Sequence, residues 1–135
     1  MSVRVDQRIK GKLNVDIHTC DLCVYTLKIT ANSKTFTPAQ EDLTQKIREA
    51  AIEIHLLCWE ANNIKVDKNE ERYKRRIELE AEAADRCNRL CALIEIAKPL
   101  FHLSSKRVKY WTEKTTSVRQ EIRAWRESDI KRLKP

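Results

Sequence analysis

The feature that most constrains this chain is a row of apolar residues spaced alternately four and three positions apart: Leu43, Ile47, Ala50, Ile54, Leu57 and Ala61. Residues at this spacing lie along one face of an α-helix, so the row predicts an amphipathic helix that packs against other helices. The segment opens with Thr37 and Pro38, and Gln40 follows three positions after Thr37, which is a helix-start pattern. It ends at Asn62 and Asn63. We therefore predict a helix over residues 37–63.

A second apolar row lies on the same predicted helix, about 150° around its axis from the first. It consists of Ile52, Leu56 and Trp59. A helix that is apolar on two sides must bury both, and a small bundle has only one interior. We predict that the second row is an oligomer interface. The alternative is that Trp59 covers a wide edge of the core.

The rest of the chain predicts an all-α fold. Its 135 residues include one glycine and three prolines, too few for the tight turns of a sheet protein. A first helix over residues 13–31 is predicted to bury Leu13, Ile17, Cys20, Val24, Leu27 and Ala31. A third helix over residues 68–97 is predicted to begin at the cap Asp67 and to end before Pro99, burying Tyr73, Ile77, Ala84, Cys91 and Ile94.

A fourth helix, capped by Ser104, is predicted to bury Val108, Trp111, Thr115, Val118, Ile122 and Trp125. Four helices with short links predict an antiparallel up-down four-helix bundle over residues 13–131. Residues 1–12 are polar and basic and predict a flexible arm, and residues 132–135 form a basic C-terminal tail.

Positive charge is concentrated at the C-terminal end of the chain. Residues 98–135 contain eleven Lys or Arg against four Asp or Glu, a net charge of +7, whereas residues 1–97 contain sixteen of each sign. A row of cations at helical spacing can follow a phosphate backbone without reading sequence. We predict that the nucleic-acid-binding residues are Lys109, Arg119, Arg123, Arg126, Lys131 and Arg132. The same cations could dock an acidic protein surface or form a solvated face.

The odd number of cysteines, five, fits reduced thiols in a reducing compartment. No apolar run approaches the roughly 18 residues of a membrane span, and the N-terminus lacks the apolar core of a signal peptide. We therefore expect a cytoplasmic protein with no membrane partner. Cys20 and Cys23 could join Cys87 and Cys91 around zinc if the first and third helices faced each other. Cysteine is commonly a small core residue, so no metal is predicted.

Arg48 and His55 are seven positions apart and therefore lie on one helix face. This spacing resembles the motif of HEPN ribonucleases, which are helical bundles whose histidine acts as general acid or base while the arginine holds the phosphate. The chain has no phosphate-cradling glycine loop and no Glu-x-x-His pair for a di-iron centre. We therefore predict a protein that is not an enzyme and has neither a cofactor nor a small-molecule substrate.

Several segments together resemble a known family. They read REAAIEIHLLCWEANNIK from Arg48, LFHLSSKRVKYW from Leu100 and VRQEIRAW from Val118. In this order they resemble the accessory variability determinant (Avd) proteins of diversity-generating retroelements, and they are similar to the four-helix proteins encoded by intervening sequences of large-subunit ribosomal RNA genes. The likeness extends over residues 13–130. Trp125 matches the family's late tryptophan, but Arg123 and Ala124 stand where the family usually has small residues, often a glycine pair.

The resemblance implies a homopentameric barrel whose basic surface binds RNA and DNA without sequence preference. It also implies association with the element's reverse transcriptase and a role in mutagenic reverse transcription of template RNA into cDNA, without catalysis by the protein itself. The ribosomal branch implies an RNA-binding bundle. A HEPN-like ribonuclease that uses Arg48 and His55, and a purely structural oligomer, are the remaining hypotheses.

Overall fold

The structure, a computed structural model, describes residues 2–65 and 69–133, with side chains described from residue 14 onward. It contains four long helices: α1 (Ser2–Thr30), α2 (Glu41–Asn63), α3 (Glu70–Leu100) and α4 (Ser105–Leu133). A short 3-10 turn, η1 (Pro38–Gln40), precedes α2. The described residues include no strand. The prediction of an all-α fold with four helices is therefore confirmed.

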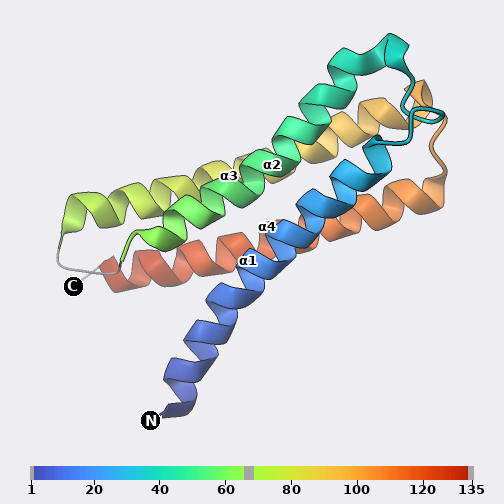
Figure 1. Ribbon diagram of the computed structural model, residues 1–135. Helices are drawn as coiled ribbons and strands as arrows, with labels where there is room; N and C mark the ends of the chain where they lie inside the picture. Colours follow the sequence, from blue (N-terminus) through green and yellow to red (C-terminus); the bar gives the residue numbers. More distant parts are fainter. Residues whose placement is uncertain (1, 66–68, 134–135) are drawn as a thin grey trace.

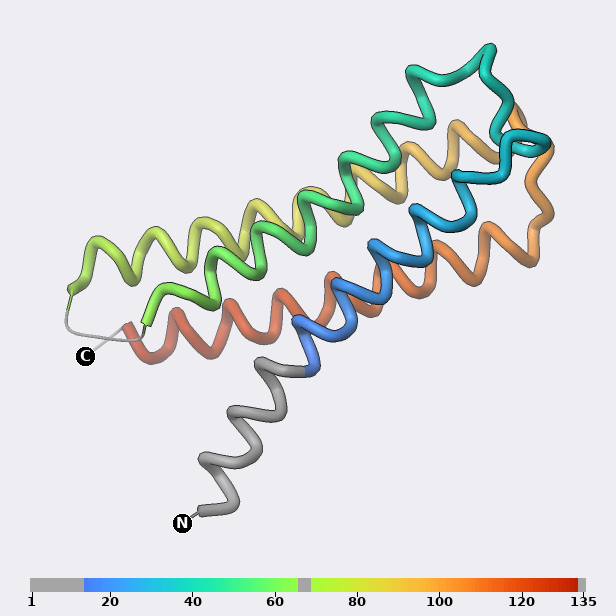
Figure 2. Tube along the Cα trace, in the orientation of Figure 1, coloured from blue at the N-terminus to red at the C-terminus, as the bar shows by residue number. Residues whose placement is uncertain are grey.

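Successive helices run in opposite directions and pack side by side as a bundle (Figure 1). The α1–α2 and α3–α4 connections lie at one end of the bundle, and the end of α2 and the start of α3 lie at the other (Figure 2). Helix α3 packs closely against both α2 and α4, whereas α1 contacts α2 more extensively than it contacts α4. Two pairs of neighbouring helices each form an edge of the bundle: α3 with α4, and α1 with α2.

The starts of α2 and α3 differ in detail from the prediction. Helix α2 begins at Glu41, because Pro38–Gln40 forms a 3-10 turn and the Thr37 side chain makes no capping hydrogen bond. Helix α3 is capped by Asn69, whose side chain accepts the N–H of Arg72 at 3.2 Å. The predicted cap Asp67 lies outside the described residues.

The α3–α4 connection confirms one boundary and corrects another. Ser104 caps α4, since its Oγ accepts the N–H of Arg107 at 3.1 Å. Helix α3 continues through Pro99 to Leu100, and the N–H of Phe101 closes the last turn on the Ala97 carbonyl at 2.9 Å. Proline disfavours helix in the residue before it, but a proline in the last turn leaves the remaining hydrogen bonds of that turn in place.

The predicted inner rows of α2 and α4 are confirmed, and that of α3 is confirmed in part. In α2, Ile47, Ala50, Ile54 and Ala61 are buried, and Leu43 and Leu57 pack against the core. In α4, Trp111, Thr115, Val118 and Ile122 are buried, with Val108 and Trp125 partly buried. In α3, Tyr73, Ala84 and Ile94 are buried, while Ile77 and Cys91 are half-buried.

The predicted inner row of α1 is wrong. Ile17 and Val24 are 52% and 41% exposed, and Cys20 and Ala31 are also exposed. Of the other two predicted residues, Leu27 is half-buried and the side chain of Leu13 lies outside the described part. The residues that α1 buries are Val15, Thr19, Leu22, Thr26 and Thr30. A search for apolar residues passes over threonine because its side chain is polar. Three threonines are nevertheless buried in this row, because their hydroxyl groups form hydrogen bonds inside the bundle.

The terminal segments stay predictions. The side chains of the predicted basic arm, residues 1–12, lie outside the described part, as do residues 134–135 of the tail. Arg132 and Leu133 belong to α4. Among the described residues, no helix has the length and apolar character needed to cross a lipid bilayer.

Candidate nucleic-acid interface

Charge is unevenly distributed among the four helices. Helix α4 carries nine Lys or Arg and four Asp or Glu, a net charge of +5, whereas α2 carries two and five, a net charge of −3. Helix α3 carries seven of each sign. Because α2 and α4 lie diagonally across the bundle, the molecule has a basic side and an acidic side. A polyanion is attracted to the basic side.

Three of the predicted cations follow the edge that α4 forms with α3. The Nη1 of Arg119 donates to Oδ1 of Asn88 on α3 at 2.7 Å. Arg126 lies close enough to the buried Glu80 of α3 to affect its titration, and Arg123 is exposed between the two arginines. The Nε atoms of Arg119 and Arg126 are buried and have no hydrogen-bond partner among the described residues. Arg119 is therefore anchored to α3, while the exposed Arg123 is placed to bind an anion.

The other three predicted cations are more scattered. At 3.6 residues per turn, Lys109 lies within about 40° of Arg123 around the axis of α4, Lys131 about 80° away and Arg132 about 180° away. The Nζ of Lys109 lies 4.0 Å from Glu113, and Nη1 of Arg132 lies 3.8 Å from the Asp129 carboxylate. The six predicted residues therefore do not form one row, and Arg132 faces the other side of the helix.

A groove runs along the same α3–α4 edge. It has a volume of about 460 Å³ and is lined by Asn88, Cys91, Ala92, Glu95, Lys98, Val108 and Thr112. Asn88 both lines this α3–α4 groove and holds Arg119. This groove could not be predicted from the sequence, because it requires two helices to be placed side by side.

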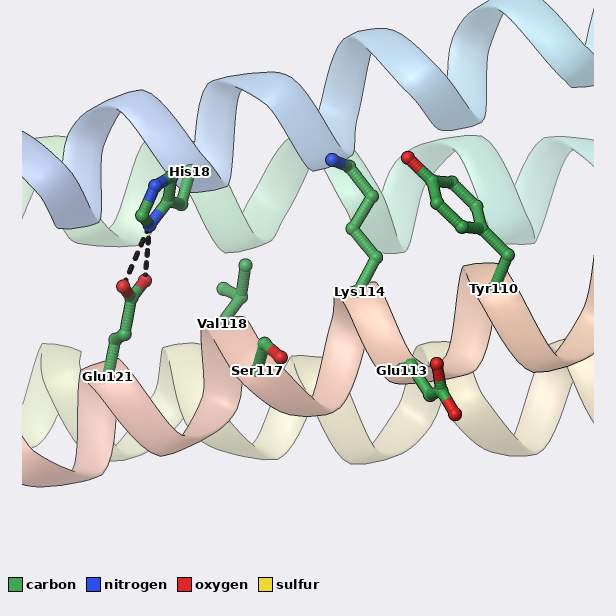
Figure 3. Close-up of a pocket in the computed structure, with 7 residues that line it drawn as sticks. All are labelled: His18, Tyr110, Glu113, Lys114, Ser117, Val118 and Glu121. Atoms are coloured by element: carbon green, nitrogen blue, oxygen red, sulfur yellow. Dashed lines mark hydrogen bonds and ion pairs between the residues drawn. The ribbon is translucent and has the colours of Figure 1, made fainter.

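A second groove lies between α1 and α4 (Figure 3). His18 of α1 reaches across to α4, where its Nδ1 lies 2.7 Å from Glu121 Oε1 and 2.8 Å from Oε2. The groove presents two carboxylates, Glu113 and Glu121, and one ammonium group, Lys114. Its charge does not favour a phosphate.

The interior between α3 and the end of α4 holds a charged cluster that sequence reasoning missed. Arg76 is fully buried; its Nε donates to Asp129 Oδ2 at 2.8 Å and its Nη1 to the carbonyl of Ile64 at 2.8 Å. Its guanidinium group also lies over the Trp125 ring, 5.3 Å from the centroid. Burial, together with the neighbouring Asp129, raises the pKa of Glu80 to about 10. This shift favours the neutral form of Glu80, whose Oε2 lies 3.7 Å from Nε of Arg76, whereas Asp129 lies closer to the guanidinium group and pairs with it.

Helices α1 and α2 leave several apolar residues exposed. Trp59 and Leu56 are each 55% exposed, so Trp59 does not cover an edge of the core within one chain. Trp59 lies one turn from His55, which bonds Thr19 of α1, with Nδ1 to Oγ1 at 2.8 Å. We use the name α1–α2 apolar face for the exposed Ile17, Val24, Leu56 and Trp59 and the half-buried Ile52, which at about 100° per residue lie on the sides of α1 and α2 that point away from the core. An exposed apolar group of this kind is typical of an interaction surface.

The two residues of the HEPN-like spacing contact α1. Nη1 of Arg48 donates to the Leu27 carbonyl at 3.0 Å and to Thr30 Oγ1 at 2.7 Å. His55 is bonded to Thr19 and lies beside Trp59, with 6.5 Å between ring centroids. Both side chains thus help to hold α1 on α2.

The cysteines do not assemble a metal site in the described part of the chain, where no group of three or more His, Cys, Asp or Glu is placed to hold a metal. Cys58 and Cys87 are buried, and burial raises the pKa of Cys87 to about 12. Such thiols are protonated and unreactive near pH 7.

Comparisons with protein-family models, with curated proteins and with solved structures find no match to this chain. The fold and the site therefore define only a class: a four-helix bundle with a basic α3–α4 edge and an exposed α1–α2 apolar face.

Proposed function

We propose that this chain is a non-enzymatic accessory protein that binds nucleic acid along its α3–α4 edge. The observation that supports this most is the net charge of +5 on α4, set diagonally opposite the net charge of −3 on α2. Lys and Arg side chains that neutralise phosphates release condensed counterions, which gives affinity without base readout. Arg119, Arg123 and Arg126 are the residues that we propose to face the phosphates.

We propose further that the protein acts in a diversity-generating retroelement. The Avd-like order of sequence segments supports this role, in which a homopentamer in the cytoplasm binds template RNA, cDNA and the element's reverse transcriptase. The exposed α1–α2 apolar face supports self-association, since Leu56 and Trp59 are each 55% exposed in the single chain. A ribosomal intervening-sequence bundle would use the same basic edge on RNA.

A charge-reversal experiment tests nucleic-acid binding. Arg119→Glu, Arg123→Glu and Arg126→Glu combined should abolish retention of RNA or DNA in a low-salt filter assay. Lys28→Glu, Lys34→Glu and Lys46→Glu combined make a matched control, because this triple variant changes the net charge equally at exposed positions outside α4. Helicity measured by circular dichroism should be retained in both.

A second variant avoids the partly buried Arg119 and Arg126. It combines Arg123→Glu with Lys109→Glu, which are both at exposed positions. Unchanged retention in these variants would refute the assignment.

The ribonuclease hypothesis makes a different forecast. Arg48 and His55 are bonded to threonines of α1, so we expect no RNA cleavage that depends on them. Purified protein and its His55→Ala variant are incubated with labelled RNA and resolved on a gel. Cleavage by the wild type that is lost in His55→Ala would overturn the accessory role.

A further inference from the structure

We propose that the α3–α4 groove binds an unpaired base of a single-stranded nucleic acid. This inference rests on the proposed function, because it assigns a type of ligand to the same edge. Its test below separates the failure of the inference from the failure of nucleic-acid binding itself.

The groove has the size and the chemistry for a planar heterocycle. Its volume of about 460 Å³ lies within the range of roughly 300–1,000 Å³ found for small-molecule sites. Cys91, Ala92 and Val108 supply apolar surface, and Glu95 and Thr112 supply polar groups. A base likewise has apolar faces and a polar edge, and a carboxylate such as Glu95 can accept hydrogen from its amino group.

Cations stand at both ends of the groove, where they can contact phosphates of a strand that places a base between them. Lys98 lines one end, and Arg119 is held at the other by its 2.7 Å hydrogen bond to Asn88. Lys98 and Asn88 are ten positions apart on α3, about 15 Å along the helix axis. The charge of Arg119 extends into the groove, because it partly offsets the rise that burial causes in the pKa of Cys91.

Charge complementarity therefore favours a nucleotide strand over a neutral apolar ligand. The α1–α4 groove of Figure 3 does not share this property, since it presents Glu113 and Glu121 beside Lys114. The bases of a duplex are paired and stacked, and extruding one costs a few kcal/mol. The α3–α4 groove should therefore distinguish a single strand from both a duplex and a bare phosphate chain.

The test measures fluorescence anisotropy of three labelled probes at low salt. These are a 12-nucleotide single strand, an abasic strand with the same number of phosphates, and a 12-base-pair duplex. We expect the wild type to bind the single strand at least about fivefold more tightly than the abasic strand, which corresponds to one net hydrogen bond to the base. We expect the duplex, whose bases are paired, to bind no more tightly per phosphate than the abasic strand.

Filling the groove should remove the preference for the single strand over the abasic strand without weakening the contacts to phosphate. Ala92 is exposed and lines the groove, so Ala92→Phe occupies it without entering the core. This variant should bind the single and abasic strands equally and keep the wild-type affinity for the abasic strand. Ala124→Phe is the matched control, because Ala124 is exposed on α4 and is not among the groove residues. It should retain the wild-type ratio.

A second readout does not depend on the variants. Alkylation of Cys91 by iodoacetamide, mapped by mass spectrometry, should slow when the single strand is bound, while the exposed Cys20 on α1 reacts at an unchanged rate. Equal wild-type affinity for single and abasic strands, an unchanged ratio in Ala92→Phe, or no protection of Cys91 would overturn the inference and leave the proposed function standing. Absence of binding to all three probes would overturn both.

Discussion

At the scale of single residues, the interior of the bundle contains more charge than the sequence pattern suggests. Arg76, Glu80 and Asp129 are all fully buried, and Arg76 links α3 to α4 and to the carbonyl of Ile64 through hydrogen bonds. Charged residues are rarely buried unless paired, so apolar periodicity alone treats all three as surface positions. Their placement depends on contacts between residues more than fifty positions apart, which a single sequence does not show.

Glu80→Gln tests the buried acid. The pKa of Glu80 is raised from 4.5 to about 10, so the folded state keeps a proton that the unfolded chain releases. The contribution of this raised pKa to the free energy of unfolding is fully present below pH 4.5. It is lost as the pH rises toward 10, by up to about 1.4 kcal/mol per pH unit. Because glutamine does not ionise, the variant should show a flatter fall in the free energy of urea unfolding between pH 5.5 and 8.

The exposed variant Glu71→Gln serves as the control for this measurement and should reproduce the slope of the wild type. A Glu80→Gln protein whose stability falls with pH as steeply as that of the wild type would show that Glu80 is ionised in the folded chain.

His102 supplies a second prediction at this scale. It is exposed and has a φ of 55°, directly after the C-cap Phe101, and the N–H of Leu103 closes the turn on the Lys98 carbonyl at 2.9 Å. Glycine adopts this left-handed conformation without strain. His102→Gly should therefore raise the free energy of unfolding by about 0.5–1 kcal/mol. Thermal unfolding checks this, and His102→Ala, which keeps a Cβ, should show no such gain.

At the scale of the elements, the buried faces of α2 and α4 could be predicted from the sequence, and the buried face of α1 could not. In α2 and α4 the four-three rows identify the buried face, because aliphatic residues and tryptophan fill it. In α1 the same count selects Ile17 and Val24, which are exposed. The true inner row contains Thr19, Thr26 and Thr30, whose hydrogen bonds depend on where α2 and α4 lie.

Thr26→Val tests this explanation. The Nε1 of Trp111 donates to Thr26 Oγ1 at 3.1 Å, and both side chains are fully buried. Valine keeps the shape of threonine and leaves the indole N–H without an acceptor, which should cost about 1–3 kcal/mol of unfolding free energy. Chemical denaturation measures this loss. Thr37→Val, at an exposed position without a capping hydrogen bond, should lie within about 0.5 kcal/mol of the wild type.

At the scale of the whole molecule, the chain presents two surfaces with different chemistry. The α1–α2 apolar face combines the predicted row Ile52, Leu56 and Trp59 with Ile17 and Val24, which were expected to be buried. The basic surface follows from the net charge of α4, which could be counted in the sequence. The alignment of Arg119, Arg123 and Arg126 along the α3–α4 edge could not, because it depends on how α3 packs against α4.

Self-association is the prediction that belongs to the apolar face. Light scattering coupled to size exclusion should give the wild type a mass several times that of the 15.9 kDa chain. Leu56→Glu with Trp59→Glu should reduce it to a single chain. Ile96→Glu with Leu100→Glu is the matched control, since these residues are also exposed, 54% and 42%, but lie on α3. A wild type that elutes as one chain would contradict the assignment.

The central claim is that the cations of the α3–α4 edge bind polyanions by electrostatics. The most direct measurement is the affinity of the wild type for a single-stranded RNA as a function of salt concentration, compared with that of Arg123→Glu with Lys109→Glu. The logarithm of the association constant should fall linearly with the logarithm of salt concentration, and the variant's slope should be smaller by roughly 0.7 for each phosphate contact removed. An affinity that does not change with salt, or a variant with the slope and affinity of the wild type, would contradict it.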